Sequence, residues 1–370
     1  MTSATICERM LADKHPTMPP ELRKSKAEGV ASAVRSALGY WETTPTALNA
    51  RLLSQYYFAL QLSIAEQVAG ADESASLETI QRHTEQGHGL GTLRGSHGAF
   101  PDNYFVAALK SGHFASYCKA SGHDLGAFAF DQRPRSWSKL KDEDTSRLVS
   151  LTDLLRRIPE LRPLIYECLA QPPLSFHLVH ATKNFELEAE KHSEHIRRTG
   201  RFPPSPIGGP SDGTSKTTYV LFSTGFGGGE GVTAAFLSGL GFPIKNIVAQ
   251  KEDEDASPSF IGEYVHPANE FWWQSLPLYK AATGTSIIVP LWRTHELFII
   301  HFVTLYALSI VVRYLPSLWH EIENGTLDHI RALLDHYTSV VDVVLPKMGI
   351  ERITGSRLHL VYPGSGSSPV

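Results

Sequence analysis

The chain has 370 residues, enough for one large or two medium domains with a substantial hydrophobic core. Its composition is that of a globular protein, with 42% hydrophobic residues, 19% charged residues and a formal net charge of −4. This balance excludes an overall basic nucleic-acid footprint and an acidic tail, so nucleic-acid binding would require a local patch.

The three cysteines lie far apart and form no CxxC pair, which argues against a disulfide framework and a cysteine-based zinc site. The N-terminus has no charged region followed by an apolar segment, so we expect no secretory signal and a cytoplasmic protein. Residues 1–19 are polar and interrupted by prolines. We expect them to form a flexible arm.

Helical periodicity begins at Pro20 and stops at Gly39. A second stretch, from Asn49 to Gly70, carries apolar residues at the i, i+3, i+4 spacing of a core-facing helix. It includes the adjacent pair Tyr56 and Tyr57. A short helix is predicted at 77–85.

Residues 87–98, GHGLGTLRGSHG, contain five glycines and two histidines. Such a loop allows the backbone to approach another group closely. Two interpretations remain open. The segment is a connector turn, or it binds a small anion through backbone N–H groups and the side chains of His88, Arg94 and His97. It is not a P-loop, because no Gly-Lys-Ser/Thr follows.

Residues 99–289 are less regular and predict a mixed α/β insert, with short strands at 174–179, 218–223 and 286–289. A Pro-, Gly- and Ser-rich linker is predicted at 199–217. The glycine-rich segment 224–231 lacks the dinucleotide-binding fingerprint, which favours a flexible hairpin or a lid.

His192 and His195 lie three residues apart on a predicted polar helix, with Glu188 and Glu194 nearby. This pattern lacks HExxH and a third spaced ligand, so a solvated helix face is favoured. We therefore expect no metal site and no cofactor.

The longest apolar run extends from Leu297 to Val312, and its clearly polar residues are His301, Thr304 and Ser309. A helix that is hydrophobic nearly all round is normally buried. The run is shorter than the roughly 18 residues that suggest a membrane span. We predict the central core helix of a soluble domain. Pro316 predicts a new helix, a last amphipathic helix is expected at 327–344, and residues 364–370 predict a disordered tail.

Two separated segments resemble the YaaC-like proteins of bacteria. The first combines residues 54–69, with their paired tyrosines, and GHGL at 87–90. The second is a late motif formed by Leu305, Tyr306, Ala307, Leu308, Ser309, Val312, Arg313, Tyr314, Pro316 and Trp319. The resemblance directs attention to Tyr57, Tyr314 and Trp319 as further ligand-binding candidates, and it implies little about chemistry.

HEPN-type ribonucleases are small helical bundles, and an arginine followed four to six residues later by a histidine is their catalytic signature. The helix that contains the paired tyrosines also resembles a helix of these bundles. Here Arg313 and His320 are seven residues apart. In a metal-independent ribonuclease the histidine moves a proton and the arginine stabilises the charged phosphorane. The structural alternative is that Arg313 pairs with Glu321 or caps the carbonyls that end its helix.

These patterns together predict a mainly α-helical fold with an α+β insert at 99–289. A helical-bundle core, HEPN-like in one interpretation, would be formed by residues 20–98 and 290–363. The favoured function is a regulatory or interaction protein that binds a partner protein or a small anionic ligand, and the family resemblance suggests stress or phage defence. The partner would be another bacterial protein or a second copy, and not a membrane. The alternative is a dimeric HEPN-type ribonuclease using Arg313 and His320 on RNA.

Overall fold

The computed structural model describes residues 1–43, 45–181, 190, 193–200, 213–223, 231–250, 259–281 and 284–358. The chain divides into two compact units. The first unit comprises Met1–Leu151 and Phe298–Val370, and the second comprises Thr152–Leu297.

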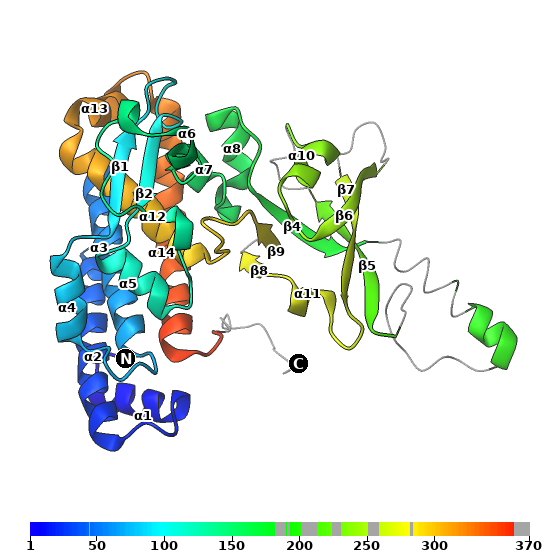
Figure 1. Ribbon diagram of the computed structural model, residues 1–370, viewed down its shortest axis with the longest axis horizontal. Coiled ribbons are helices and arrows are strands. Elements are labelled where there is room, and N and C mark those ends of the chain that lie inside the picture. Colours follow the sequence, from blue (N-terminus) through cyan, green and yellow to red (C-terminus); the bar gives the residue numbers. More distant parts are fainter. Residues whose placement is uncertain are drawn as a thin grey trace. The chain divides into compact units, whose positions relative to one another are not determined.

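The helices of the first unit come from both ends of the chain (Figure 1). They are α1 (Ala4–Lys14), α2 (Pro20–Glu42), α3 (Leu48–Val68), α4 (Leu77–Glu85), α5 (His113–Ala120), α6 (Asp142–Thr145), α12 (Leu297–Tyr314), α13 (Pro316–Asn324) and α14 (Asp328–Thr354). Helix α3 packs against both α2 and α14. The range expected to be a flexible arm includes α1, in which Cys7 and Leu11 are fully buried.

Helix α12 confirms the prediction of a buried core helix. Among the described residues it is the one helix long and apolar enough to span a membrane, and 78% of it is buried inside the structure. Its buried hydroxyls find partners within the helix: Thr304 donates to the Ile300 carbonyl at 2.8 Å and Ser309 to the Tyr306 carbonyl at 2.7 Å. Because these polar groups are satisfied, the helix tolerates them in the core.

A three-stranded antiparallel sheet lies in the same unit, in the order β1-β2-β3. Its strands are β1 (Leu90–Arg94), β2 (Tyr104–Ala108) and β3 (Val149–Ser150). Two hydrogen bonds join the sheet to α12: the Tyr306 hydroxyl donates to the Leu90 carbonyl at 2.8 Å, and the Tyr104 hydroxyl to the Ala307 carbonyl at 3.5 Å. Sheet and helices therefore share one core.

The prediction of a mainly α-helical fold around a helical-bundle core is wrong. The protein is a mixed α/β fold with two antiparallel sheets. The error arose at 87–98, where the many glycines favoured a loop. Residues Leu90 to Arg94 instead pair along their whole length with β2. Strand formation depends on such pairing and on burial more than on local composition.

The second unit contains a six-stranded antiparallel sheet in the order β6-β7-β5-β4-β9-β8. Its strands are β4 (Ser175–His180), β5 (Ser215–Ser223), β6 (Ile244–Gln250), β7 (Ser259–Pro267), β8 (Leu278–Ala281) and β9 (Gly284–Ile288). Its helices are α7 (Leu151–Leu155), α8 (Arg162–Leu169), α10 (Ala234–Gly239) and α11 (Trp272–Ser275). The strands predicted at 174–179, 218–223 and 286–289 are confirmed as β4, β5 and β9.

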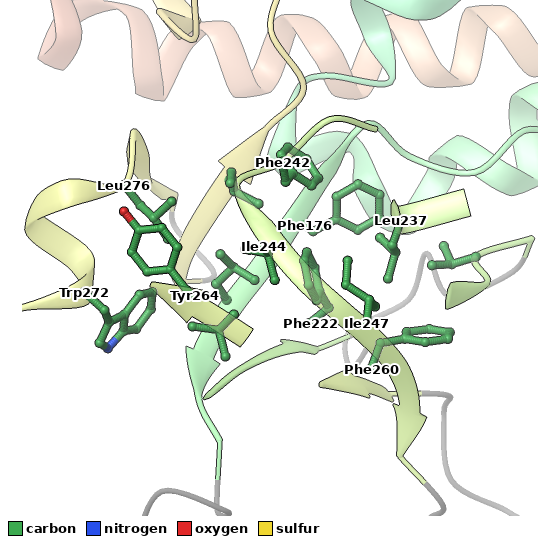
Figure 2. Close-up of a cluster of buried hydrophobic side chains, with 14 residues drawn as sticks. Phe176, Phe222, Leu237, Phe242, Ile244, Ile247, Phe260, Tyr264, Trp272 and Leu276 are labelled. Carbon is green, nitrogen blue, oxygen red and sulfur yellow. The ribbon is translucent and has the colours of Figure 1, made fainter. Parts of the chain in front are cut away.

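The core of the second unit is rich in aromatic side chains. Figure 2 shows Phe176, Phe222 and Phe242 gathered within the cluster. The ring centroids of Phe176 lie 6.1 Å from Phe222 and 6.0 Å from Phe242, both in T-shaped geometry. Edge-to-face packing of this kind adds to the stabilisation from buried area.

Several predicted features lie outside the described residues. These are most of the 199–217 linker, all but Gly231 of the 224–231 segment, the 364–370 tail, and the residues His192 and Glu188.

Candidate functional site

A cavity of about 440 Å³ opens in the first unit at the ends of β1 and α12. This size falls within the roughly 300–1,000 Å³ range of small-molecule sites. Three arginines line it, together with one histidine, three tyrosines, a threonine and apolar side chains. They are Arg94, Arg133, Arg313, His88, Tyr104, Tyr306, Tyr314, Thr92, Leu93, Ile310 and Leu315. None of these lining residues is acidic. We call this cavity the arginine pocket.

The GHGL segment places His88 in the arginine pocket by pressing its backbone against the start of α5. The amides of His113 and Phe114 donate to the carbonyls of Gly87 and His88 at 2.9 and 3.0 Å. Gly89 has a φ of +75°, and a Cβ on it would lie 2.8 Å from the Phe114 nitrogen. Only glycine meets both requirements.

We expect Gly89→Ala to destabilise the protein by about 2–3 kcal/mol, because it combines an unfavourable positive φ with a backbone clash. Chemical denaturation monitored by circular dichroism would measure the change. Gly122→Ala is the matched control. Gly122 also has a positive φ, +77°, but a Cβ there would meet nothing within 4 Å. Equal losses in the two variants would contradict the close approach described here.

The surroundings of His88 favour the neutral form of its imidazole. Burial lowers the pKa of its imidazole, and the positive charge of Arg313 lowers it further. Its Nδ1 lies 2.9 Å from the hydroxyl of Tyr56, whose own pKa is raised by burial. A hydroxyl that donates to Nδ1 leaves the ring proton on Nε2. That nitrogen forms no hydrogen bond within the described part of the chain and is available to a ligand.

The arginine pocket carries positive charge that no carboxylate balances. Arg133 donates to the Thr92 carbonyl at 3.4 Å. Its side chain packs closely on Gly91, since a Cβ added to Gly91 would lie only 2.7 Å from the Arg133 Cγ. Arg94 and Arg133 are solvent-exposed. Among the residues the structure describes, neither they nor Arg313 form an ion pair with Asp or Glu. Such a cluster repels itself and favours a bound anion.

Helix α12 supplies one wall of the pocket from its last two turns. Tyr306, Ile310 and Arg313 recur at the i, i+4, i+7 spacing of a single helix face. Ser309, four residues earlier on the helix, holds the guanidinium of Arg313 in place. The Arg313 Nε donates to the Ser309 carbonyl at 3.1 Å, and its Nη2 donates to the Ser309 hydroxyl at 3.2 Å. The helix then ends at Tyr314, and Pro316 starts α13 at a position where proline is favoured.

The structure brings some of the predicted site residues together and leaves others apart. His88, Arg94, Tyr314 and Arg313 all line the arginine pocket. Tyr57, His97, Trp319 and His320 do not: Tyr57 stacks on Tyr40 with centroids 5.3 Å apart, Trp319 is buried in α13, and His97 and His320 are exposed. The side chain of Arg313 bonds to Ser309 within its own helix, and within the part of the chain that the structure describes it forms no ion pair with Glu321.

Three aromatic or charged residues of the pocket were not among the predicted candidates. Tyr306 belongs to the late motif, and its presence there was the signal that could have identified it. Tyr104 and Arg133 lie in the irregular 102–137 stretch, which contains no recognisable motif. Within the described residues, no three His, Cys, Asp or Glu side chains gather closely enough to hold a metal ion.

Comparison with known proteins identifies one family. The model of the YaaC-like protein family matches residues 1–353, which include every residue that lines the pocket. No curated protein and no solved structure matches. The HEPN-type resemblance receives no support from these comparisons. Since the match covers more than nine-tenths of the sequence, the chain belongs to the YaaC-like protein family.

Proposed function

We propose that this protein is a ligand-responsive binding protein whose arginine pocket takes a small anion. The observation that carries the proposal is the convergence of Arg94, Arg133 and Arg313 on one cavity with no acidic residue in its lining. An anion would supply the missing counter-charge, and guanidinium groups form short, charge-assisted bonds to phosphate and carboxylate oxygens.

The origin of the pocket residues supports the same proposal. Tyr56, His88 and Arg313 come from the tyrosine-pair helix, the GHGL segment and the late motif, which lie far apart in the chain. The Tyr56 hydroxyl contacts His88, and both Tyr56 and His88 lie against the ring of Tyr306, at centroid distances of 5.9 and 5.8 Å. The GHGL segment and the late motif thus line one cavity, and the tyrosine-pair helix supports it through the contact of Tyr56 with His88.

Binding is better supported than catalysis. The ribonuclease interpretation requires His320 to act beside Arg313, but His320 is exposed on α13 and does not line the pocket. The histidine that does line it, His88, has its Nδ1 engaged by Tyr56. We therefore propose a regulatory or interaction role, in which the bound anion reports a cellular state.

Isothermal titration calorimetry at low ionic strength, with sulfate and with inorganic phosphate, tests the proposal. We expect the wild-type protein to bind and Arg133→Gln to weaken binding at least about tenfold, since hydrogen bonds to charged groups contribute roughly 1.5–3 kcal/mol. Arg135→Gln is the matched control. Arg135 is also exposed, two residues away, and does not line the pocket. Absence of binding to the wild type, or equal losses in both variants, would overturn the proposal.

Anion affinity should also rise as the pH falls from about 7.5 to 5.5. The pKa of His88 lies below its ordinary value in the free protein, and a bound anion would raise it. Binding therefore takes up a proton over this range, with up to about a tenfold gain per pKa unit. Three other titratable groups near His88 do not titrate there: burial raises the pKa values of Tyr56 and Tyr306, and burial lowers the pKa of His113 to about 3.

Sulfate is the appropriate probe for this measurement, because its own charge is constant over the range. In His88→Gln the pH dependence should disappear while some sulfate binding remains. A wild-type affinity that does not change with pH would show that His88 does not contact the anion.

A further inference from the structure

We infer that the ligand of the arginine pocket is a nucleotide, held by its phosphate at the arginines and by its base on Tyr314. This inference rests on the proposed function, because it names the class of anion that the same pocket would take. Three features of the pocket support it: the number of cationic side chains in the lining, the apolar part of the lining and the position of Tyr314.

The charge of the pocket fits a phosphoryl group better than a single carboxylate. Arg94, Arg133 and Arg313 provide three positive charges, and the Nε2 of His88 can add a fourth donor. A phosphate monoester is close to a dianion at neutral pH and presents three terminal oxygens. Each guanidinium offers two donors in a planar fork that matches two such oxygens. A monocarboxylate would leave most of the positive charge unbalanced.

The lining also contains more apolar surface than an inorganic anion would contact. Leu93, Ile310 and Leu315 all contribute to the cavity. The hydroxyls of Tyr104 and Tyr306 donate to the carbonyls of Ala307 and Leu90, so these tyrosines contribute ring surface to the wall. A cavity of about 440 Å³ with both kinds of lining accommodates a ligand that carries an apolar group beside its charge.

Tyr314 has the properties of a stacking platform at the pocket. Tyr314 is 64% exposed, although it is the last residue of a helix that is mostly buried. The guanidinium carbon of Arg313 lies 5.1 Å from its ring centroid, which orients the ring beside the cationic group. No other aromatic side chain of the described residues stacks on it. An exposed ring beside an anion site provides the surface on which nucleic-acid bases stack.

Comparing four classes of probe by calorimetry tests the inference: inorganic phosphate, ribose 5-phosphate, adenosine, and the nucleoside 5′-monophosphates of adenine, guanine, cytosine and uracil. We expect at least one nucleotide to bind at least tenfold more tightly than ribose 5-phosphate, as base stacking on an aromatic ring is worth about 1–3 kcal/mol. Adenosine, which has no phosphate, should bind weakly or not at all.

Two variants of Tyr314 separate the stacking from the charge. Tyr314→Ala should reduce nucleotide affinity to about that of ribose 5-phosphate, a much larger loss than the same variant causes for ribose 5-phosphate itself. Tyr314→Phe should keep the nucleotide preference. Because the side chain is exposed, both variants should retain the wild-type unfolding midpoint.

The outcomes distinguish this inference from the proposed function. If ribose 5-phosphate and the nucleotides bind equally well to the wild type, or if Tyr314→Ala keeps the nucleotide preference, the nucleotide inference is wrong. The anion proposal would still stand, provided that Arg133→Gln weakens anion binding at least about tenfold. If neither sulfate nor any phosphate-containing probe binds, both are wrong.

Discussion

Replacing Lys26 by methionine should lower the free energy of unfolding by about 4 kcal/mol. Lys26 lies on α2 and is only 2% exposed. Its Nζ, which has three N–H donors, lies within hydrogen-bond distance of four carbonyl oxygens, those of Val68, Gly70, Asp72 and Ala75, at 3.0, 3.2, 2.7 and 3.0 Å. These carbonyls belong to the last residue of α3 and to the segment that follows it, so the ammonium caps the C-terminus of that helix.

The physical cause of the loss is the set of carbonyls left behind. Methionine fills a similar volume but donates no hydrogen bond, so several buried acceptors would lose their partner. Keeping Lys26 charged costs free energy, because burial lowers the pKa of its ammonium group. The negative charges of Asp72 and Glu73 raise that pKa and oppose the effect of burial.

Lys24→Met is the matched control for this measurement. Lys24 lies two residues earlier on the same helix and is exposed, so its replacement should change stability by no more than about 0.5 kcal/mol. Urea denaturation of the two variants beside the wild type gives the comparison. Equal stabilities would contradict a capping role for Lys26.

Phe302→Ala should destabilise the first unit by about 4 kcal/mol, within the range for truncating a buried phenylalanine. Phe302 is fully buried in the middle of α12. Its ring centroid lies 6.0 Å from Tyr56, 5.7 Å from Phe114 and 6.2 Å from Tyr117. Removal of the ring leaves a cavity where α3, α5 and α12 meet.

The same substitution should weaken anion binding, because Phe302 supports Tyr56 and Tyr56 positions His88. Phe302→Leu should show a smaller form of both effects, since it preserves most of the volume. Val343→Ala, at a side chain 69% exposed on α14, should change neither. Thermal unfolding and sulfate titration of the three variants measure the two quantities, and a stable Phe302→Ala would show that this contact contributes little.

The helices near the pocket were predictable because their signal is local. Apolar residues at helical spacing in 49–70 correspond to α3 (Leu48–Val68), and the continuous apolar run before Arg313 corresponds to α12. A helix satisfies its backbone hydrogen bonds within one segment, so a single window of sequence contains most of the information about it. Pro316 likewise predicted the start of α13, because proline is favoured in the first turn.

The sheets were much less predictable, because each strand depends on partners elsewhere in the chain. Strand β1 looks like a loop in isolation, since Gly91 and its flanking glycines disfavour a strand. Its pairing with β2 and its hydrogen bond from Tyr306 are long-range features. The same reason explains why β6, β7 and β8 were not predicted in the second unit.

The sequence by itself determined the helical periodicity and the membership of the family, and it identified His88, Arg94, Arg313 and Tyr314 as candidate site residues. Only the tertiary structure decided that these four line one cavity, that Arg133 and Tyr104 join them, and that Tyr57, His97, Trp319 and His320 lie elsewhere. The physical reason is that a binding site is defined by proximity in space. Its residues come here from a loop, two strands, a helix end and an irregular segment, and no local pattern encodes which of them will meet.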